Sequence, residues 1–165
     1  MSSGSSECLP HLKPVEDRLM AAATTYRTAS EAETIALGER LARELPPRGV
    51  VLLIGNLGAG KTTLAKGIVN GLGAAAADEV SSPTFMLIHE YGEGRVYHVD
   101  LYRLDDPREV ATLGLDEIFE RDALVLIEWG ERFPRLLPAE RTEIRIRPLA
   151  DDEREIEVTR LRGRD

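Results

Sequence analysis

A glycine-rich loop between an apolar run and a helical pattern constrains this chain more than any other feature. Residues 55–62 read Gly-Asn-Leu-Gly-Ala-Gly-Lys-Thr, which fits the phosphate-binding pattern of a glycine, four residues and then Gly-Lys-Ser/Thr. The apolar run 50–54 stands directly before the loop, and Leu64, Ile68 and Leu72 recur after it at helical spacing. Strand, loop and helix in this order are the context in which the pattern binds phosphate, so the sequence predicts a nucleotide site.

The spacing of the loop explains how it would hold phosphate. Gly55, Gly58 and Gly60 let the backbone curl so that successive N–H groups point at phosphate oxygens, and the N-terminus of the following helix adds partial positive charge. The Lys61 ammonium is expected to reach the β- and γ-phosphates, and the Thr62 hydroxyl to bind Mg²⁺. The predicted nucleotide contacts in this stretch are Asn56, Leu57, Gly58, Ala59, Gly60, Lys61, Thr62 and Thr63.

The charge balance limits what this chain can bind by itself. It has 21 Lys and Arg against 29 Asp and Glu, a formal net charge of −8. Because affinity for nucleic acid comes mainly from Lys and Arg on phosphates, an acidic chain is a poor stand-alone RNA binder. If the protein works on RNA, a partner should hold that RNA.

Cysteine usage and hydropathy exclude further classes. The single cysteine, Cys8, cannot form an internal disulfide or a cysteine-based zinc site. No run approaches the roughly 18 apolar residues of a membrane-spanning helix, and nothing resembles a secretory signal. We therefore expect a cytoplasmic protein without membrane contact.

The chain divides into an extension and one domain. Residues 1–25 begin Met-Ser-Ser-Gly-Ser-Ser and contain Pro10 and Pro14, which predicts a flexible N-terminal extension. Residues 26–165 suffice for a single domain with its own hydrophobic core.

Local patterns predict the elements of this domain. Ser30 and Glu33 form a capping box at the start of a helix that Pro46 and Pro47 end. The apolar run 123–127 suits a central parallel strand that is covered on both faces. Two hairpins, from strands 85–91 and 95–102 and from strands 142–147 and 155–161, are expected, with a short helix starting at Asp106, Pro107 and Glu109. The prediction is an α/β P-loop NTPase fold, in which a mainly parallel sheet is flanked by helices and extended by antiparallel hairpins.

Two acids could complete the site. Glu128 directly follows the apolar run 123–127, where a phosphate-binding loop needs an acid to hold Mg²⁺ and its water, and we favour it as the metal ligand. Asp100 lies near the end of the strand 95–102 and could orient the attacking water or complete the metal shell. The alternative for each is a solvated acid at the end of a strand.

Four further side chains are weighed for a role in the site. Thr84 follows Pro83, where a switch-like loop could place a hydroxyl near the γ-phosphate, although it could equally be a turn residue. Trp129 could stack on a ligand or fill the core, and Arg154 could reach a nucleotide from the last hairpin. His98 has no second histidine at ligand spacing, so a metal role for it is not expected.

Several motifs converge on one family. Beside the loop, the chain contains Ser-Pro-Thr-Phe at 82–85, Tyr-His-Val-Asp-Leu-Tyr-Arg at 97–103 and Glu-Trp at 128–129, in this order and at short spacings. The loop alone is unspecific, but the His-x-Asp-Leu-Tyr-Arg stretch together with Glu-Trp is highly specific. Over about residues 30–160 the chain resembles the TsaE (YjeE) family, bacterial ATPases of tRNA threonylcarbamoyladenosine (t6A) biosynthesis.

The resemblance implies an activity and partners. A member of this family would hydrolyse ATP in support of a TsaB–TsaD complex, in which TsaD transfers the threonylcarbamoyl group to adenosine 37 of tRNA. The tRNA would then meet this chain only through the complex, and residues 26–165 would be a P-loop ATPase domain. By motif match, Lys61, Asp100 and Glu128 would be catalytic, Thr62 and Glu128 would bind Mg²⁺, and Trp129 would occupy a further functional position. Ser30 and Arg154 match regions that approach the nucleotide.

Two other functions stay open at this stage. A small-molecule or nucleoside kinase would close an arginine-rich lid over its second substrate, and the segment 131–141 contains Arg132, Arg135 and Arg141, although prolines interrupt it. A nucleotide-sensing module would switch a partner without useful turnover. The chain lacks the Asn-Lys-x-Asp motif that reads guanine, which favours ATP over GTP.

Overall fold

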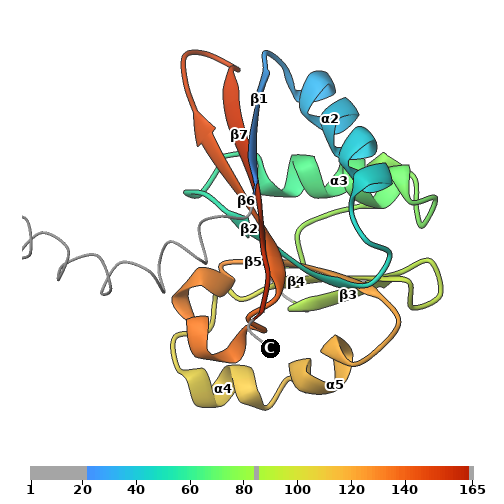
Figure 1. Cartoon of the computed structure of the whole chain (residues 1–165), viewed down its shortest axis with the longest axis vertical. Helices are drawn as coiled ribbons and strands as arrows, with labels where there is room; N and C mark the ends of the chain where they lie inside the picture. Colours follow the sequence, from blue (N-terminus) through green and yellow to red (C-terminus); the bar gives the residue numbers. More distant parts are fainter. Residues whose placement is uncertain (1–21, 84–85, 164–165) are drawn as a thin grey trace, which may run out of the picture.

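A mixed sheet with helices on both faces forms the part of the chain that the computed structural model describes, residues 22–83 and 86–163 (Figure 1). From one edge to the other, its strands are β1 (Ala23–Thr28), β7 (Arg154–Leu161), β6 (Arg141–Pro148), β2 (Gly49–Ile54), β5 (Leu124–Glu128), β4 (Val96–Asp100) and β3 (Ile88–Tyr91).

The sheet has a parallel centre and antiparallel margins. The pairs β6–β2, β2–β5 and β5–β4 are parallel, whereas β1–β7, β7–β6 and β4–β3 are antiparallel. The expectation of a mainly parallel sheet is therefore corrected to a mixed one, because two hairpins and β1 add antiparallel pairs to the parallel centre. The run 123–127 does supply the central strand, and all five residues of β5 are buried between two parallel neighbours.

Strand β1 corrects the expected boundary of the domain. It begins at Ala23, inside the segment 1–25 that the sequence predicts to be an extension, and pairs antiparallel with β7. Threonine and tyrosine suit a strand, but most of these side chains are exposed, so β1 lacks the apolar alternation that would reveal it. Pairing with β7 makes it a strand. The domain begins by Ala23, and residues 1–21 lie outside the described residues.

The first hairpin forms where predicted, with shorter strands. β3 starts at Ile88 rather than at residue 85, because Leu87 has a φ of +65°, a left-handed conformation that an extended strand cannot contain. β4 spans Val96–Asp100 rather than 95–102. The second hairpin, β6–β7, matches its prediction closely, and Ile144, Ile146 and Ile156 are buried.

Two helical layers cover the sheet. Helices α2 (Glu31–Glu44) and α3 (Lys61–Gly71) pack on one face, and α4 (Pro107–Ala111) and α5 (Leu115–Phe119) on the other (Figure 1). The predicted N-cap of α2 is confirmed, since the Ser30 hydroxyl accepts from the Glu33 N–H at 3.1 Å. Short 3₁₀ turns occur at Ala77–Glu79, Gly130–Arg132 and Pro134–Leu136. Among the helices of the described ranges, none is long and apolar enough to cross a membrane.

Glycines bring α2 and α3 into backbone contact. A Cβ atom built on Gly67 would lie 2.1 Å from the Ile35 carbonyl oxygen, and one on Gly38 would lie 2.6 Å from the Leu64 carbonyl oxygen. Real side chains do not tolerate such distances, so only glycine allows this approach. The N-termini of the two helices lie close together, because Ser30 and Glu31 line the same hollow as Gly60 and Thr63.

Candidate functional site

The glycine-rich loop connects the end of β2 to the start of α3. Gly58 and Gly60 have φ values of +79° and +110°, in the region that favours glycine. Gly60 is the N-cap residue of α3, and no side chain caps this helix. The first N–H groups of α3 therefore face the loop as hydrogen-bond donors, at the end of the helix that attracts anions.

Two adjoining hollows meet at this loop. One has a volume of about 220 Å³ and the other of about 140 Å³, and both are lined by Gly58, Gly60 and Thr63. The first also contains the predicted residues Leu57, Lys61, Thr62, Glu128 and Trp129, and the second contains Ser30 and Arg154. Most of the predicted contacts thus surround one continuous region.

Lys61 is held at the floor of the first hollow. Its Nζ donates to the Gly55 carbonyl oxygen at 2.7 Å and lies 3.5 Å from the centre of the Trp129 ring. Burial lowers the pKa of Lys61, while the charges of Glu128, Glu131 and Asp100 act in the opposite direction. A cation in such surroundings is poorly hydrated, which strengthens its attraction for an anion.

Thr62, in the first turn of α3, is hydrogen-bonded to Glu128, the last residue of β5. The Thr62 hydroxyl donates to Glu128 Oε2 at 3.1 Å, and Glu128 is only 3% exposed at the end of β5. The alternative of a solvated acid is therefore wrong for Glu128. A hydroxyl and a carboxylate are hard oxygen donors of the kind that Mg²⁺ prefers.

Asp100 lies beside Glu128 on the neighbouring strand. The two residues are direct partners in the parallel β4–β5 register. Asp100 is 3% exposed and accepts hydrogen bonds from the Ser82 hydroxyl at 2.8 Å and the Tyr102 N–H at 2.9 Å. Asp100 is therefore a buried acid with defined hydrogen-bond partners, and not a solvated one. It lies beside Glu128 because parallel strands bring their carboxyl ends to the same edge of the sheet.

Trp129 is placed by an unusual backbone conformation. Its φ is +66°, which costs energy for a residue with a bulky side chain. The ring lies 5.1 Å from that of Tyr102, centre to centre, and lines the first hollow. The indole is therefore partly in the core and partly in the wall of the site, so the two predictions for it are compatible.

Two of the predicted contacts within the described residues, Ala59 and Asn56, do not line these hollows. The Ala59 side chain is fully buried, although its carbonyl oxygen accepts from Arg154 Nε at 2.9 Å and so links β7 to the loop. Asn56 lines a different hollow, together with Arg145 and Arg147. Thr84 lies outside the described residues.

The sequence model of the family described as threonylcarbamoyl adenosine biosynthesis protein TsaE matches residues 28–156. This chain belongs to the TsaE family. It is 43% identical to a tRNA threonylcarbamoyladenosine biosynthesis protein TsaE from Bacillus subtilis, over 84% of this chain and 87% of that one. It is 46% identical to a TsaE from a Nostoc species, over 64% and 67% of the two chains.

A solved structure shares the fold. The crystal structure of YdiB from Bacillus subtilis superposes with a TM-score of 0.70 and 37% identity, covering 87% of this chain and 88% of that one. The family, as its description and its named members state, belongs to t6A biosynthesis, a modification of tRNA.

Sequence reasoning missed three polar residues around the TsaE motifs. His98 contacts Glu128, Ser82 contacts Asp100, and Glu131 lies close enough to Lys61 to influence its pKa. The position of His98 was predictable in part. Residues two apart in a strand lie on the same face of the sheet, so His98 was expected on the same face as Asp100. Ser82 lies on a loop and Glu131 in a single 3₁₀ turn, and neither is long enough to show a periodic pattern that would predict a partner.

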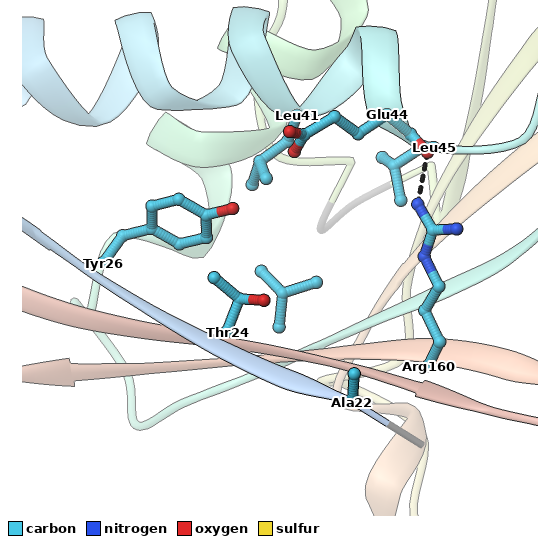
Figure 2. A pocket seen from close by; sticks show the side chains of 8 residues that line it. Ala22, Thr24, Tyr26, Leu41, Glu44, Leu45 and Arg160 are labelled. Atoms are coloured by element: carbon cyan, nitrogen blue, oxygen red, sulfur yellow. Dashed lines mark hydrogen bonds between the residues drawn. The ribbon is translucent and has the colours of Figure 1, made fainter.

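A larger hollow lies away from this site. It has a volume of about 390 Å³ and opens between α2 and the strands β1 and β7 (Figure 2). Leu41, Leu45 and Tyr26 form apolar walls, and the Arg160 guanidinium donates to the Glu44 carbonyl at the end of α2. This bond ties β7 to the last turn of α2 and satisfies one of the helix's terminal carbonyls.

Glu131, a partly buried acid close to Lys61, makes the stability of the protein depend on pH. Its Oε1 is buried without a hydrogen-bond partner among the residues described, and burial raises the pKa of Glu131 despite the opposing charges of Lys61 and Arg132. The folded protein therefore retains this proton at pH values where the unfolded chain has released it. Stability from the neutral carboxyl is complete below the ordinary pKa and is lost as the pH rises through the raised pKa.

We therefore expect Glu131→Gln to stabilise the protein at pH 7 and to have little effect near pH 4. The free energy of unfolding should rise by up to about 1 kcal/mol at pH 7, because burying a neutral amide costs less than burying an ionised carboxylate. Urea titrations at both pH values measure this, with the exposed Glu117→Gln as the control. An equal gain at both pH values would contradict a charge effect.

Proposed function

We propose that this protein binds and hydrolyses ATP with Mg²⁺, and thereby supports threonylcarbamoyl transfer to adenosine 37 of tRNA in the cytoplasm by a TsaB–TsaD complex. The observation that carries the proposal is the meeting of Lys61 and Thr62 with Glu128 around one hollow, in a chain of the TsaE family. The family supports the pathway, and the site supports the use of a nucleoside triphosphate.

The residues present fit Mg·ATP. Gly58, Gly60 and the start of α3 offer backbone N–H groups, and Lys61 offers a cation for the terminal phosphates. Mg²⁺ would be held by the Thr62 hydroxyl and the Glu128 carboxylate and would neutralise charge on the phosphate oxygens. In the described ranges no group of three or more His, Cys, Asp or Glu side chains could hold a metal, which agrees with a metal that takes its remaining ligands from phosphate and water.

Each remaining side chain then has a task in the proposed reaction. Asp100, one strand from Glu128, orients the attacking water or completes the metal shell. Trp129 forms a wall and holds Lys61 beneath its ring. Ser30 and Arg154 line the second hollow, which would receive the part of the nucleotide beyond the phosphates. The net charge of −8 supports leaving the tRNA to the partner complex.

The contacts of two arginines count against the kinase alternative. Arg132 donates to the Tyr102 carbonyl oxygen at 2.9 Å and to two neighbouring carbonyls, which ties it to the segment after β4. Arg141 pairs with Glu143 at 2.7 Å and donates to the Pro138 carbonyl oxygen at 2.9 Å. A kinase lid needs arginines that move onto the second substrate, whereas these hold the fold together.

The experiment that tests the proposal measures ATP hydrolysis by this protein alone and with TsaB–TsaD, together with t6A formation on tRNA. Strong stimulation by the complex and t6A that depends on this chain are expected. Phosphoryl transfer to a nucleoside without any partner would overturn the proposal in favour of a kinase. Nucleotide binding that supports t6A without turnover would instead make the protein a sensor.

A further inference from the structure

His98 lies fully buried against Glu128. Its Nε2 is 2.6 Å from Glu128 Oε2, and the two residues are 0% and 3% exposed. The other ring nitrogen, Nδ1, is buried and has no hydrogen-bond partner among the residues described. A histidine in the core is normally satisfied at both nitrogens or faces water, so this arrangement calls for a reason other than packing.

The unpartnered Nδ1 identifies which nitrogen carries the proton. The ionised Glu128 carboxylate can only accept, so the ring nitrogen 2.6 Å from Oε2 must carry a proton, and a proton on Nδ1 would be an N–H buried without an acceptor. An imidazolium, or the neutral form protonated at Nδ1, would create such an orphaned N–H. The neutral ring protonated at Nε2 avoids it, and His98 then donates to Glu128.

The bond distinguishes the two carboxylate oxygens of Glu128. Oε2 accepts from His98 at 2.6 Å and from the Thr62 hydroxyl at 3.1 Å, whereas Oε1 makes only a 3.4 Å contact with that hydroxyl. The carboxylate is therefore anchored through Oε2, and Oε1 retains more of its capacity to accept.

We propose that His98 is a positioning residue: it fixes the Glu128 carboxylate through Oε2 so that Oε1 is presented to Mg²⁺. The inference rests on the proposed ATP- and Mg²⁺-dependent function. A ligating carboxylate held by a buried donor keeps one orientation and loses little side-chain entropy when the metal binds. Removal of such a donor commonly costs 10- to 100-fold in metal affinity or activity.

The test compares His98→Gln with His98→Leu. The Gln side chain can place an N–H donor near the position of Nε2, whereas Leu fills similar space without a donor. If His98 only filled the core, the apolar Leu would be the better substitute for both stability and activity. If His98 positions Glu128, Leu would equal or exceed Gln in stability, and Gln would exceed Leu in function.

Three measurements separate these outcomes: urea unfolding, partner-stimulated ATP hydrolysis, and the Mg²⁺ concentration that half-saturates binding of a fluorescent ATP analogue. We expect His98→Leu to lower kcat by about 10-fold or more and to raise the half-saturating Mg²⁺ concentration by a similar factor, with nucleotide binding in EDTA unchanged. His98→Gln should recover most of both losses. Should the Leu variant fail to fold, His98→Met supplies an adaptable apolar side chain for the same comparison.

The positioning role is overturned if His98→Leu keeps the wild-type kcat and Mg²⁺ dependence, or if activity follows stability across the variants. These results are distinct from failure of the proposed function, in which the wild-type protein itself hydrolyses no ATP. In that case the Mg²⁺ dependence of analogue binding still decides whether His98 positions Glu128.

Discussion

Lys61→Ala should abolish tight ATP binding, with an affinity loss of about 100-fold or more, because charge-assisted hydrogen bonds to phosphate are among the strongest that a side chain makes. Alanine removes both the charge and its reach, whereas the backbone N–H groups of the loop remain. Isothermal titration with Mg·ATP measures the change. The cation that now lies 3.5 Å from the Trp129 ring centre would also disappear, so indole fluorescence offers a second readout.

Lys66→Ala is the matched control for this change. Lys66 belongs to the same helix and carries the same charge, but it lines neither hollow of the site. Its substitution should leave the affinity for Mg·ATP within about threefold of wild type, since a partly exposed charge beyond direct contact contributes little. Tight binding by Lys61→Ala, or equal losses in both variants, would contradict the role of Lys61.

Glu128→Ala should reduce ATP hydrolysis far more than nucleotide binding. We expect kcat to fall by about 100-fold or more, because the metal loses a ligand at the point where charge develops on the transferred phosphate. The affinity for nucleotide should change by less than about fivefold, since Lys61 and the loop amides still hold the phosphates. Stimulated hydrolysis and equilibrium binding of the same preparations give the two numbers.

Two further variants refine the test at Glu128. Glu128→Gln keeps the shape of the side chain and one oxygen that can accept from Thr62 and His98, but it replaces the other carboxylate oxygen with an NH2 group, so its loss of activity reports the metal ligand and its charge rather than packing. Glu117→Ala removes an exposed acid from α5, on the opposite face of the sheet, and should leave turnover unchanged. Wild-type turnover in Glu128→Ala would show that the metal assignment is wrong and would favour Asp100 as the acid that binds Mg²⁺.

Several features were predictable because they depend on neighbours in the chain. The cap at Ser30 is made by a residue three positions away, and the second hairpin follows from apolar alternation on both sides of a short turn. The central strand followed from the apolar run 123–127, which is typical of a strand covered on both faces of the sheet. The edge strand β1 was missed for the opposite reason, since its side chains are mostly exposed and only its partner β7 makes it a strand.

The glycine-rich loop, its strand and helix, and the residue types that such a site needs follow from residues that are close together in the chain. The way these parts come together depends on how the strands pair in the folded protein. The parallel register of β4 and β5 sets Asp100 directly beside Glu128, and the same face brings His98 within 2.6 Å of that carboxylate. Those contacts join residues about 30 positions apart, and no local period encodes which strand becomes the neighbour of which. The chemistry of the loop is local, whereas the arrangement of the acids and the histidine around it depends on the pairing of strands.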